Sequence, residues 1–112
     1  MDMQLIETDG LQKVVLTGRL DTQGVSVIET QFSAGVVAGG RDTLVDLSNV
    51  DYLASLGVRM LISTTRALSG RGRQLVLFGA QPQVVEIIET LGIDELIPVA
   101  VTESEARVLL TQ

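Results

Sequence analysis

The chain has 112 residues, a net charge of −6, and neither cysteine nor histidine. This length is typical of one domain, so we expect a single domain over residues 1–112. The absence of cysteine excludes disulfides and zinc–thiolate sites, and the absence of histidine removes the usual general base near neutral pH. A chain this acidic is repelled by nucleic acid and by anionic lipid.

Hydrophobic residues make up 46% of the chain, but aromatic residues only 3%. We therefore expect a core of Val, Leu, Ile and Ala, which suits strands buried on both faces and covered by helices. No apolar run approaches the roughly 18 residues that span a bilayer. The acidic N-terminus lacks the apolar stretch of a signal peptide. We expect a cytoplasmic protein without membrane insertion.

The first third of the chain predicts a hairpin followed by a helix. Asp9-Gly10 separates two strand-like segments, residues 3–8 and 11–20, and is a strong hairpin signal. Residues 22–40 then carry apolar side chains at helical spacing and end in two glycines. The expected inward face of this helix consists of Val25, Ile28, Phe32 and Val36.

The middle of the chain predicts a second strand–helix pair. Residues 43–48 form a short apolar segment typical of a buried strand. Helical periodicity begins at Leu56 and ends at Gly70, and Ser55 stands where the N-cap of this helix is expected. The expected inward face consists of Val58, Leu61, Ile62, Thr65 and Leu68.

The last third predicts two more such pairs. Residues 73–80 are a buried strand, followed by a third helix that begins at Pro82, where the first turn tolerates proline. Residues 95–101 are strand-like, and a capping-box spacing at residues 102–105 introduces the last helix. The inward residues of these two helices are expected to be Val84, Ile87, Ile88, Leu91, Ala106, Leu109 and Leu110.

The order β-β-α-β-α-β-α-β-α predicts an α/β fold. Alternation of this kind gives a mainly parallel mixed sheet with right-handed crossovers, here opened by one antiparallel hairpin and carrying about four helices.

No motif for catalysis or nucleotide binding is present. The serine-hydrolase elbow, the P-loop and the dinucleotide fingerprint are all absent, so we expect neither an enzyme nor a cofactor. Asp21, Asp46 and Asp51 are expected near strand ends, where parallel sheets bind ligands. They serve either as caps and turn residues or, as an alternative, as ligands of Mg²⁺. Their spacing matches no metal motif, and we expect no metal site.

Ser55 allows two compatible roles. As an N-cap, its oxygen accepts a hydrogen bond from a free backbone N–H. A phosphoryl group on the same oxygen would lie at the positive end of the helix dipole and add about −1.5 to −2 charges. We therefore treat Ser55 as a cap that is also a candidate phosphoacceptor.

The helix after Ser55 is expected to carry a protein-binding face. If the inward residues are those given above, Leu56, Met60 and Ala67 point outward, with Ser63 between them and Arg59 and Arg66 along one flank. An apolar centre with a polar rim is typical of an interface. The alternative is that a neighbouring helix covers Leu56 or Met60.

Three segments resemble STAS domains of the anti-sigma-factor-antagonist type. TLVDLSNVDYLASLGVRML, residues 43–61, resembles the central signature, in which a buried strand leads to a serine at the start of a helix. LTGRLDTQGV, residues 16–25, resembles the Gly-x-Leu-Asp segment. ETLGIDELIPVAVTESEA, residues 89–106, resembles the C-terminal segment. The resemblance spans nearly the whole chain in the right order and implies a STAS fold.

The resemblance also implies partner switching between bacterial proteins. The unphosphorylated antagonist binds an anti-sigma factor that is also a serine kinase of the ATPase-kinase fold. Phosphorylation breaks the complex, and a metal-dependent serine phosphatase restores it. On this basis Ser55 is the phosphoacceptor, Asp21, Asp46 and Asp51 lie near it, and the partner-binding residues are Leu56, Gly57, Arg59, Met60, Ser63 and Ala67.

One departure from the family pattern leaves alternatives open. This chain reads Ala54-Ser55-Leu56-Gly57, whereas typical members have Asp-Ser-Ser-Gly or Asp-Ser-Thr-Gly. The first alternative is a STAS scaffold subunit without phosphorylation, for example on the nucleotide-binding subunit of a transporter. The second is a small metal- or nucleotide-dependent enzyme that uses the three aspartates.

Overall fold

The computed structural model of the protein describes residues 1–111; Gln112, the last residue of the expected domain, lies outside the described residues. Its centre is a five-stranded sheet in the order β1-β2-β3-β4-β5. The first pair is antiparallel and the other three are parallel, which confirms the predicted mixed sheet. The strands are β1 (Asp2–Thr8), β2 (Leu11–Leu20), β3 (Thr43–Leu53), β4 (Leu75–Phe78) and β5 (Val99–Ala100).

The hairpin turn lies where the sequence predicts it. Asp9 and Gly10 have φ angles of 53° and 77°. Two consecutive positive φ values are what a two-residue type I′ hairpin loop requires, and Asp-Gly is a preferred pair for it. The turn sets the register in which Thr8 pairs with Leu11 and Asp2 with Thr17.

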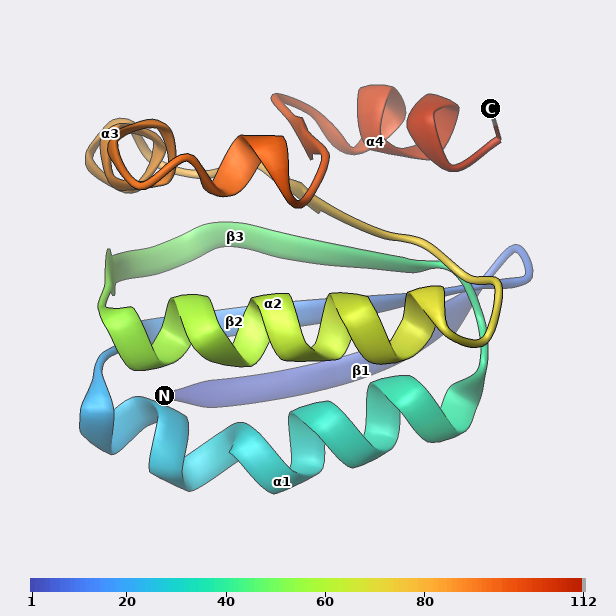
Figure 1. The fold of residues 1–112 in the computed structure, drawn as a ribbon, viewed down its shortest axis with the longest axis horizontal. Helices are drawn as coiled ribbons and strands as arrows, with labels where there is room; N and C mark the ends of the chain where they lie inside the picture. The colour runs from blue at the N-terminus through green and yellow to red at the C-terminus, as the bar shows by residue number, and fades with distance from the viewer. Residues whose placement is uncertain (112) are drawn as a thin grey trace.

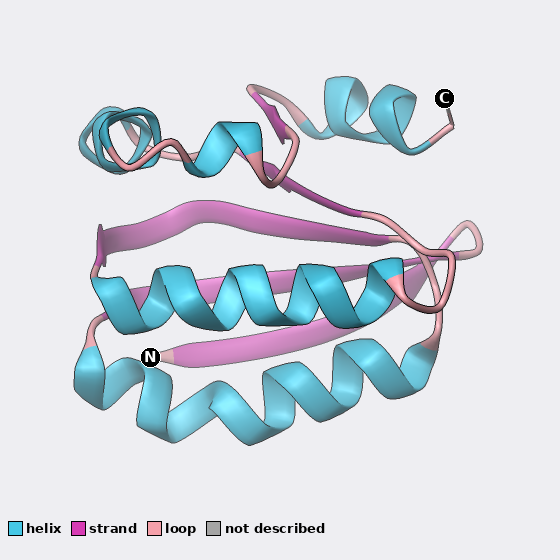
Figure 2. Ribbon diagram, viewed as in Figure 1, coloured by secondary structure: helices cyan, strands magenta, loops and turns pink. Residues whose placement is uncertain are grey.

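Helices cover both faces of the sheet (Figures 1 and 2). The larger core joins residues of the first three helices to one sheet face, and a smaller cluster joins the fourth helix to Leu44, Val76 and Phe78 on the other face. In Figure 1 the first two helices run side by side along the strands. The helices are α1 (Thr22–Gly39), α2 (Ser55–Ser69), α3 (Pro82–Thr90) and α4 (Glu103–Leu110), with a 3₁₀ turn, η1 (Ile93–Glu95).

The predicted inward residues of α1 are all buried, and so are Val84 and Ile88 of α3. Leu91 is an exception, because α3 ends at Thr90 and leaves the Leu91 side chain 56% exposed. The buried strand residues are mainly Val and Leu, as the composition indicated.

Two strands differ most from the prediction, while the strand expected at residues 73–80 is shortened to Leu75–Phe78. The strand expected at residues 43–48 continues to Leu53, because β2 stays paired with it through two register shifts as far as Leu20. The strand expected at residues 95–101 is reduced to Val99–Ala100. Residues 93–95 form η1 instead, and Pro98 has no N–H to donate to a strand ladder.

Within residues 1–111, none of the helices combines the length and the apolar character needed to span a bilayer.

Candidate partner-binding site

The transition from β3 to α2 is made by Ala54. Its N–H donates to the carbonyl oxygen of Leu20 at 2.9 Å, and its own carbonyl accepts from Val58 N–H at 3.0 Å. Ala54 has an extended backbone and is the N-cap of α2, but it has no side-chain acceptor. The prediction that Ser55 caps the helix is therefore wrong by one position, because β3 pairs with β2 right up to the start of α2.

Ser55 is the first residue of α2, and it is exposed. In the described part of the chain, its hydroxyl makes no side-chain hydrogen bond. The hydroxyl of Ser55 is therefore not used for capping α2, and the residue lies on the surface of the molecule.

Gly57 fixes how closely the first turn of α2 approaches the sheet. A Cβ atom on this residue would lie 2.9 Å from the carbonyl oxygen of Leu20 and 3.1 Å from the Cδ1 atom of Leu53. Any larger side chain would push the start of α2 away from the end of β2. Gly57, expected among the partner-binding residues, is buried in this contact.

The inward face of α2 is rotated relative to the prediction. Met60 is only 2% exposed and belongs to the larger core, so the expectation that it points outward is wrong. Thr64, one turn later, is also buried, and its hydroxyl lies 3.5 Å from that of Ser33 on α1. The helix thus packs against α1 as well as against the sheet, and this second contact buries the side that carries Met60.

The exposed side of α2 is polar and cationic. It consists of residues that follow one another at helical spacing, and we call it the α2 exposed face: Ser55, Arg59, Ser63, Arg66 and Ala67. Leu56 is half-buried and packs against the larger core. Helix α2 contains no acidic residue, and within residues 1–111 neither of its arginines forms an ion pair. The apolar centre predicted for this face is absent.

Of the three aspartates, Asp21 is connected most directly to the start of α2. Leu20 and Ala54, which precede Asp21 and Ser55, are joined by the hydrogen bond described above. The Asp21 carboxylate caps α1 by accepting from Gly24 N–H at 2.8 Å. This hydrogen bond, aided by Arg19, lowers the pKa of Asp21, while desolvation opposes the shift.

Asp46 and Asp51 do not flank the end of β3, as the sequence predicted, but lie within it. Asp46 accepts from Ser48 N–H at 2.9 Å, which is a local turn-like contact, and Asp51 is exposed. In the described part of the chain, no group of three acidic side chains is placed to hold a metal ion. The three aspartates therefore do not form the carboxylate cluster that the magnesium alternative requires.

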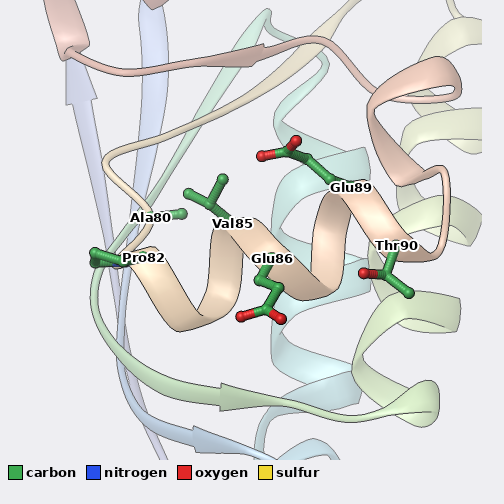
Figure 3. A pocket seen from close by; sticks show the side chains of 6 residues that line it. All are labelled: Ala80, Pro82, Val85, Glu86, Glu89 and Thr90. Atoms are coloured by element: carbon green, nitrogen blue, oxygen red, sulfur yellow. The ribbon is translucent and has the colours of Figure 1, made fainter.

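A pocket of about 420 Å³ lies elsewhere, on α3 (Figure 3). Its lining includes Val85, Glu86 and Glu89, and no residue of β3 or α2 lines it. The sequence contains no motif for this pocket, and its acidic residues, Glu86 and Glu89, read only as exposed positions of an amphipathic helix. The pocket shares no residue with the α2 exposed face.

Comparison with known proteins identifies the family of the chain. The family model described as "Mlab, STAS domain" matches residues 3–98. BtrV of Bordetella bronchiseptica, which bears the name of an anti-sigma factor antagonist, is 29% identical over 89% of this chain and 86% of its own. The anti-sigma-B factor antagonist of Staphylococcus aureus is 26% identical over 88% of this chain and 92% of its own.

A solved structure agrees with these matches. The crystal structure of an anti-sigma factor antagonist from Mycobacterium paratuberculosis superposes with a TM-score of 0.84 and 26% identity, covering 99% of this chain and 94% of that one. The fold, the family model and the named relatives agree, and the chain belongs to the STAS domain family, among relatives that are anti-sigma factor antagonists.

Proposed function

We propose that this protein is a partner-switching regulator, an anti-sigma factor antagonist whose binding is controlled at Ser55. Unphosphorylated, it binds an anti-sigma factor that is also a serine kinase of the ATPase-kinase fold. Phosphorylated, it is released, and a metal-dependent serine phosphatase reverses the modification. The chain itself is substrate and ligand, and catalysis belongs to its cytoplasmic partners.

The proposal depends mainly on the position of Ser55. This residue is exposed in the first turn of α2, and the N-cap of the helix is Ala54 and not Ser55. The names of the Bordetella, Staphylococcus and Mycobacterium relatives support the antagonist role. Ser55 also lies at one end of the α2 exposed face, so a group attached to it would border a docking partner.

The charge of the α2 exposed face gives the switch a physical basis. The face carries two arginines on a chain whose net charge is −6. A phosphate on Ser55 would add about −1.5 to −2 charges and cancel the positive charge of the face. An acidic partner surface that binds the two arginines would then face a neutral or negative surface. Juxtaposed like charges lower the affinity of an interface.

The covalent step needs no catalytic residue of this chain. The Ser55 oxygen attacks the γ-phosphorus of ATP held by the kinase, the bond to the β-phosphate oxygen breaks, and ADP leaves. The hydroxyl proton is taken up by a base on the kinase. Hydrolysis by the phosphatase returns the serine and releases inorganic phosphate.

The proposal is tested by a pull-down from a lysate of the native organism with wild type, Ser55→Ala and Ser55→Asp as baits. Mass spectrometry identifies the captured proteins and examines Ser55 for phosphate. We expect wild type and Ser55→Ala to capture a serine kinase of the ATPase-kinase fold and Ser55→Asp to lose it. If all three baits capture the same proteins and Ser55 is never modified, the switch is refuted and the scaffold alternative takes its place.

A further inference from the structure

We propose that Arg59 binds the phosphate of phosphorylated Ser55, so that phosphorylation both adds negative charge and withdraws an arginine from the α2 exposed face. This inference rests on the proposed function, because it concerns the regulation of the same site. It assigns to Arg59 an intramolecular role in the phosphorylated state, in addition to contact with a partner in the unphosphorylated state.

The spacing of Ser55 and Arg59 places their side chains on one face of α2. Ser55 and Arg59 are four residues apart in the uninterrupted helix α2, shown in Figure 1. Residues at i and i+4 lie on the same helix face, with Cβ atoms roughly 5–6 Å apart. The long arginine side chain spans that distance to a phosphate on the serine oxygen.

Both Ser55 and Arg59 are available for such a contact. Both side chains are exposed, and within residues 1–111 neither is engaged in a hydrogen bond or an ion pair. Two other arginines, Arg19 and Arg71, are by contrast already engaged. Arg19 pairs with Asp21 and lies over the Tyr52 ring, and Arg71 donates to the carbonyl of Val37.

The order of the two groups along the helix and the chemistry of the guanidinium also favour the contact. An anion placed N-terminal to a cation at i, i+4 is the favourable orientation on a helix, because it also agrees with the helix dipole. The planar guanidinium donates two parallel hydrogen bonds to phosphate oxygens, which a lysine cannot do. No acidic residue of α2 competes for Arg59.

The consequence is that one modification changes two contacts. In the unphosphorylated protein, Arg59 is free to pair with a carboxylate of the partner. After phosphorylation, its guanidinium is held by the phosphate of its own helix. The partner then faces added negative charge and also loses one of its two cationic contacts, leaving Arg66.

The test measures the phosphate directly and needs neither the kinase nor the partner. Phosphoserine is incorporated at position 55 during translation in wild type, Arg59→Gln and Arg66→Gln, and the second pKa of the phosphate is measured by ³¹P NMR titration. Arg66→Gln is the matched control: it removes the same charge from the same face, but 11 residues, or about 16 Å, along the helix from Ser55.

We expect Arg59→Gln to raise the second pKa of the phosphate by about 0.3 pH unit or more, and Arg66→Gln to leave it within error of wild type. Identical titrations of wild type and Arg59→Gln would overturn the inference. If the titrations are identical but phosphorylation still releases the partner, the proposed function stands without the Arg59 contact. If Arg59→Gln shifts the pKa but phosphorylation leaves partner affinity unchanged, the contact exists and the switch does not.

Discussion

Ala54 occupies the N-cap of α2, and its methyl group cannot accept a hydrogen bond from the first free N–H groups of the helix. Ala54→Asp would supply that acceptor and place a negative charge at the positive end of the helix dipole. We predict an increase of about 1 kcal/mol in the free energy of unfolding, measured by urea denaturation. Ala34→Asp, which adds the same charge inside α1, should give no such gain. An unchanged midpoint for Ala54→Asp would contradict the assignment of Ala54 as the cap.

Met60 is a core residue, and its truncation tests the corrected orientation of α2. Met60→Ala removes a buried side chain and leaves a cavity, so we predict a loss of about 2–5 kcal/mol in the free energy of unfolding. Ser63→Ala, on the exposed side of the same helix, should change it by less than about 0.5 kcal/mol. Equal, small effects of the two substitutions would show that Met60 points to solvent after all.

At this scale the sequence predicted the exposed polar side chains of α2 correctly, but it predicted the orientation of Met60 wrongly. Ser55, Arg59, Ser63 and Ala67 are exposed on one face, as the helical wheel indicated. Met60 was assigned to the wrong side because α2 has apolar residues over much of its circumference. The contact with α1, which a single-sequence wheel cannot contain, decides which of them are buried.

Helix α4 is held to the hairpin by an ion-pair network. The Lys13 ammonium lies 2.7 Å from one carboxylate oxygen of Glu103, and the Arg107 guanidinium lies 3.1 Å from the other. Arg107 also lies 2.9 Å from the carboxylate of Asp9 in the hairpin turn. The network joins residues that are far apart in sequence. It holds α4 in the position where Ala106 and Leu110 pack in the smaller core cluster.

This network makes the stability contributed by α4 depend on pH. The hydrogen bond from Lys13, with help from Arg107, lowers the pKa of Glu103 below the usual 4.5, although desolvation opposes the shift. Because the folded-state pKa is the lower one, the stabilisation is fully present above about pH 4.5 and is lost as the pH falls through the folded-state value.

We therefore predict that Glu103→Gln lowers the free energy of unfolding at pH 7 by at most about 1 kcal/mol, since the carboxylate is partly solvated. The deficit should shrink as the pH falls below about 4.5, when measured by urea denaturation at pH 7 and at an acidic pH at which both proteins remain folded. Glu29→Gln, an exposed substitution on α1, serves as the control and should show no deficit at pH 7. A Glu103→Gln deficit of the same size at both pH values would exclude the ionic origin.

Elements with strong local signals are those that the sequence predicted correctly. The Asp9-Gly10 hairpin and the face of α1 depend on turn chemistry and on periodicity within a few residues. The extension of β3 to Leu53 depends instead on its pairing with β2, and β5 is limited to the two residues after Pro98 that pair with Leu77 and Phe78 of β4. Such long-range pairings leave no periodic signal in the segment itself.

Over the whole molecule, the charge is unevenly distributed. Residues 74–106 contain no lysine or arginine but carry six acids, Glu86, Glu89, Asp94, Glu95, Glu103 and Glu105. The only charged residues of helix α2 are two arginines, Arg59 and Arg66. An approaching acidic partner is therefore steered toward the α2 exposed face and away from the C-terminal third of the molecule. A phosphate at Ser55 would cancel the positive charge of the α2 exposed face, the docking surface that we propose.

The most direct test of the central claim is the affinity of the captured kinase for protein with and without phosphate on Ser55. Isothermal titration is carried out with ADP instead of ATP, so that no phosphoryl transfer occurs during the measurement. Protein with phosphoserine at Ser104, an exposed residue of α4, is the matched control. We predict that phosphate on Ser55 weakens binding on the order of 100-fold, whereas phosphate on Ser104 has little effect. Equal dissociation constants for the unmodified and Ser55-phosphorylated forms would contradict the account.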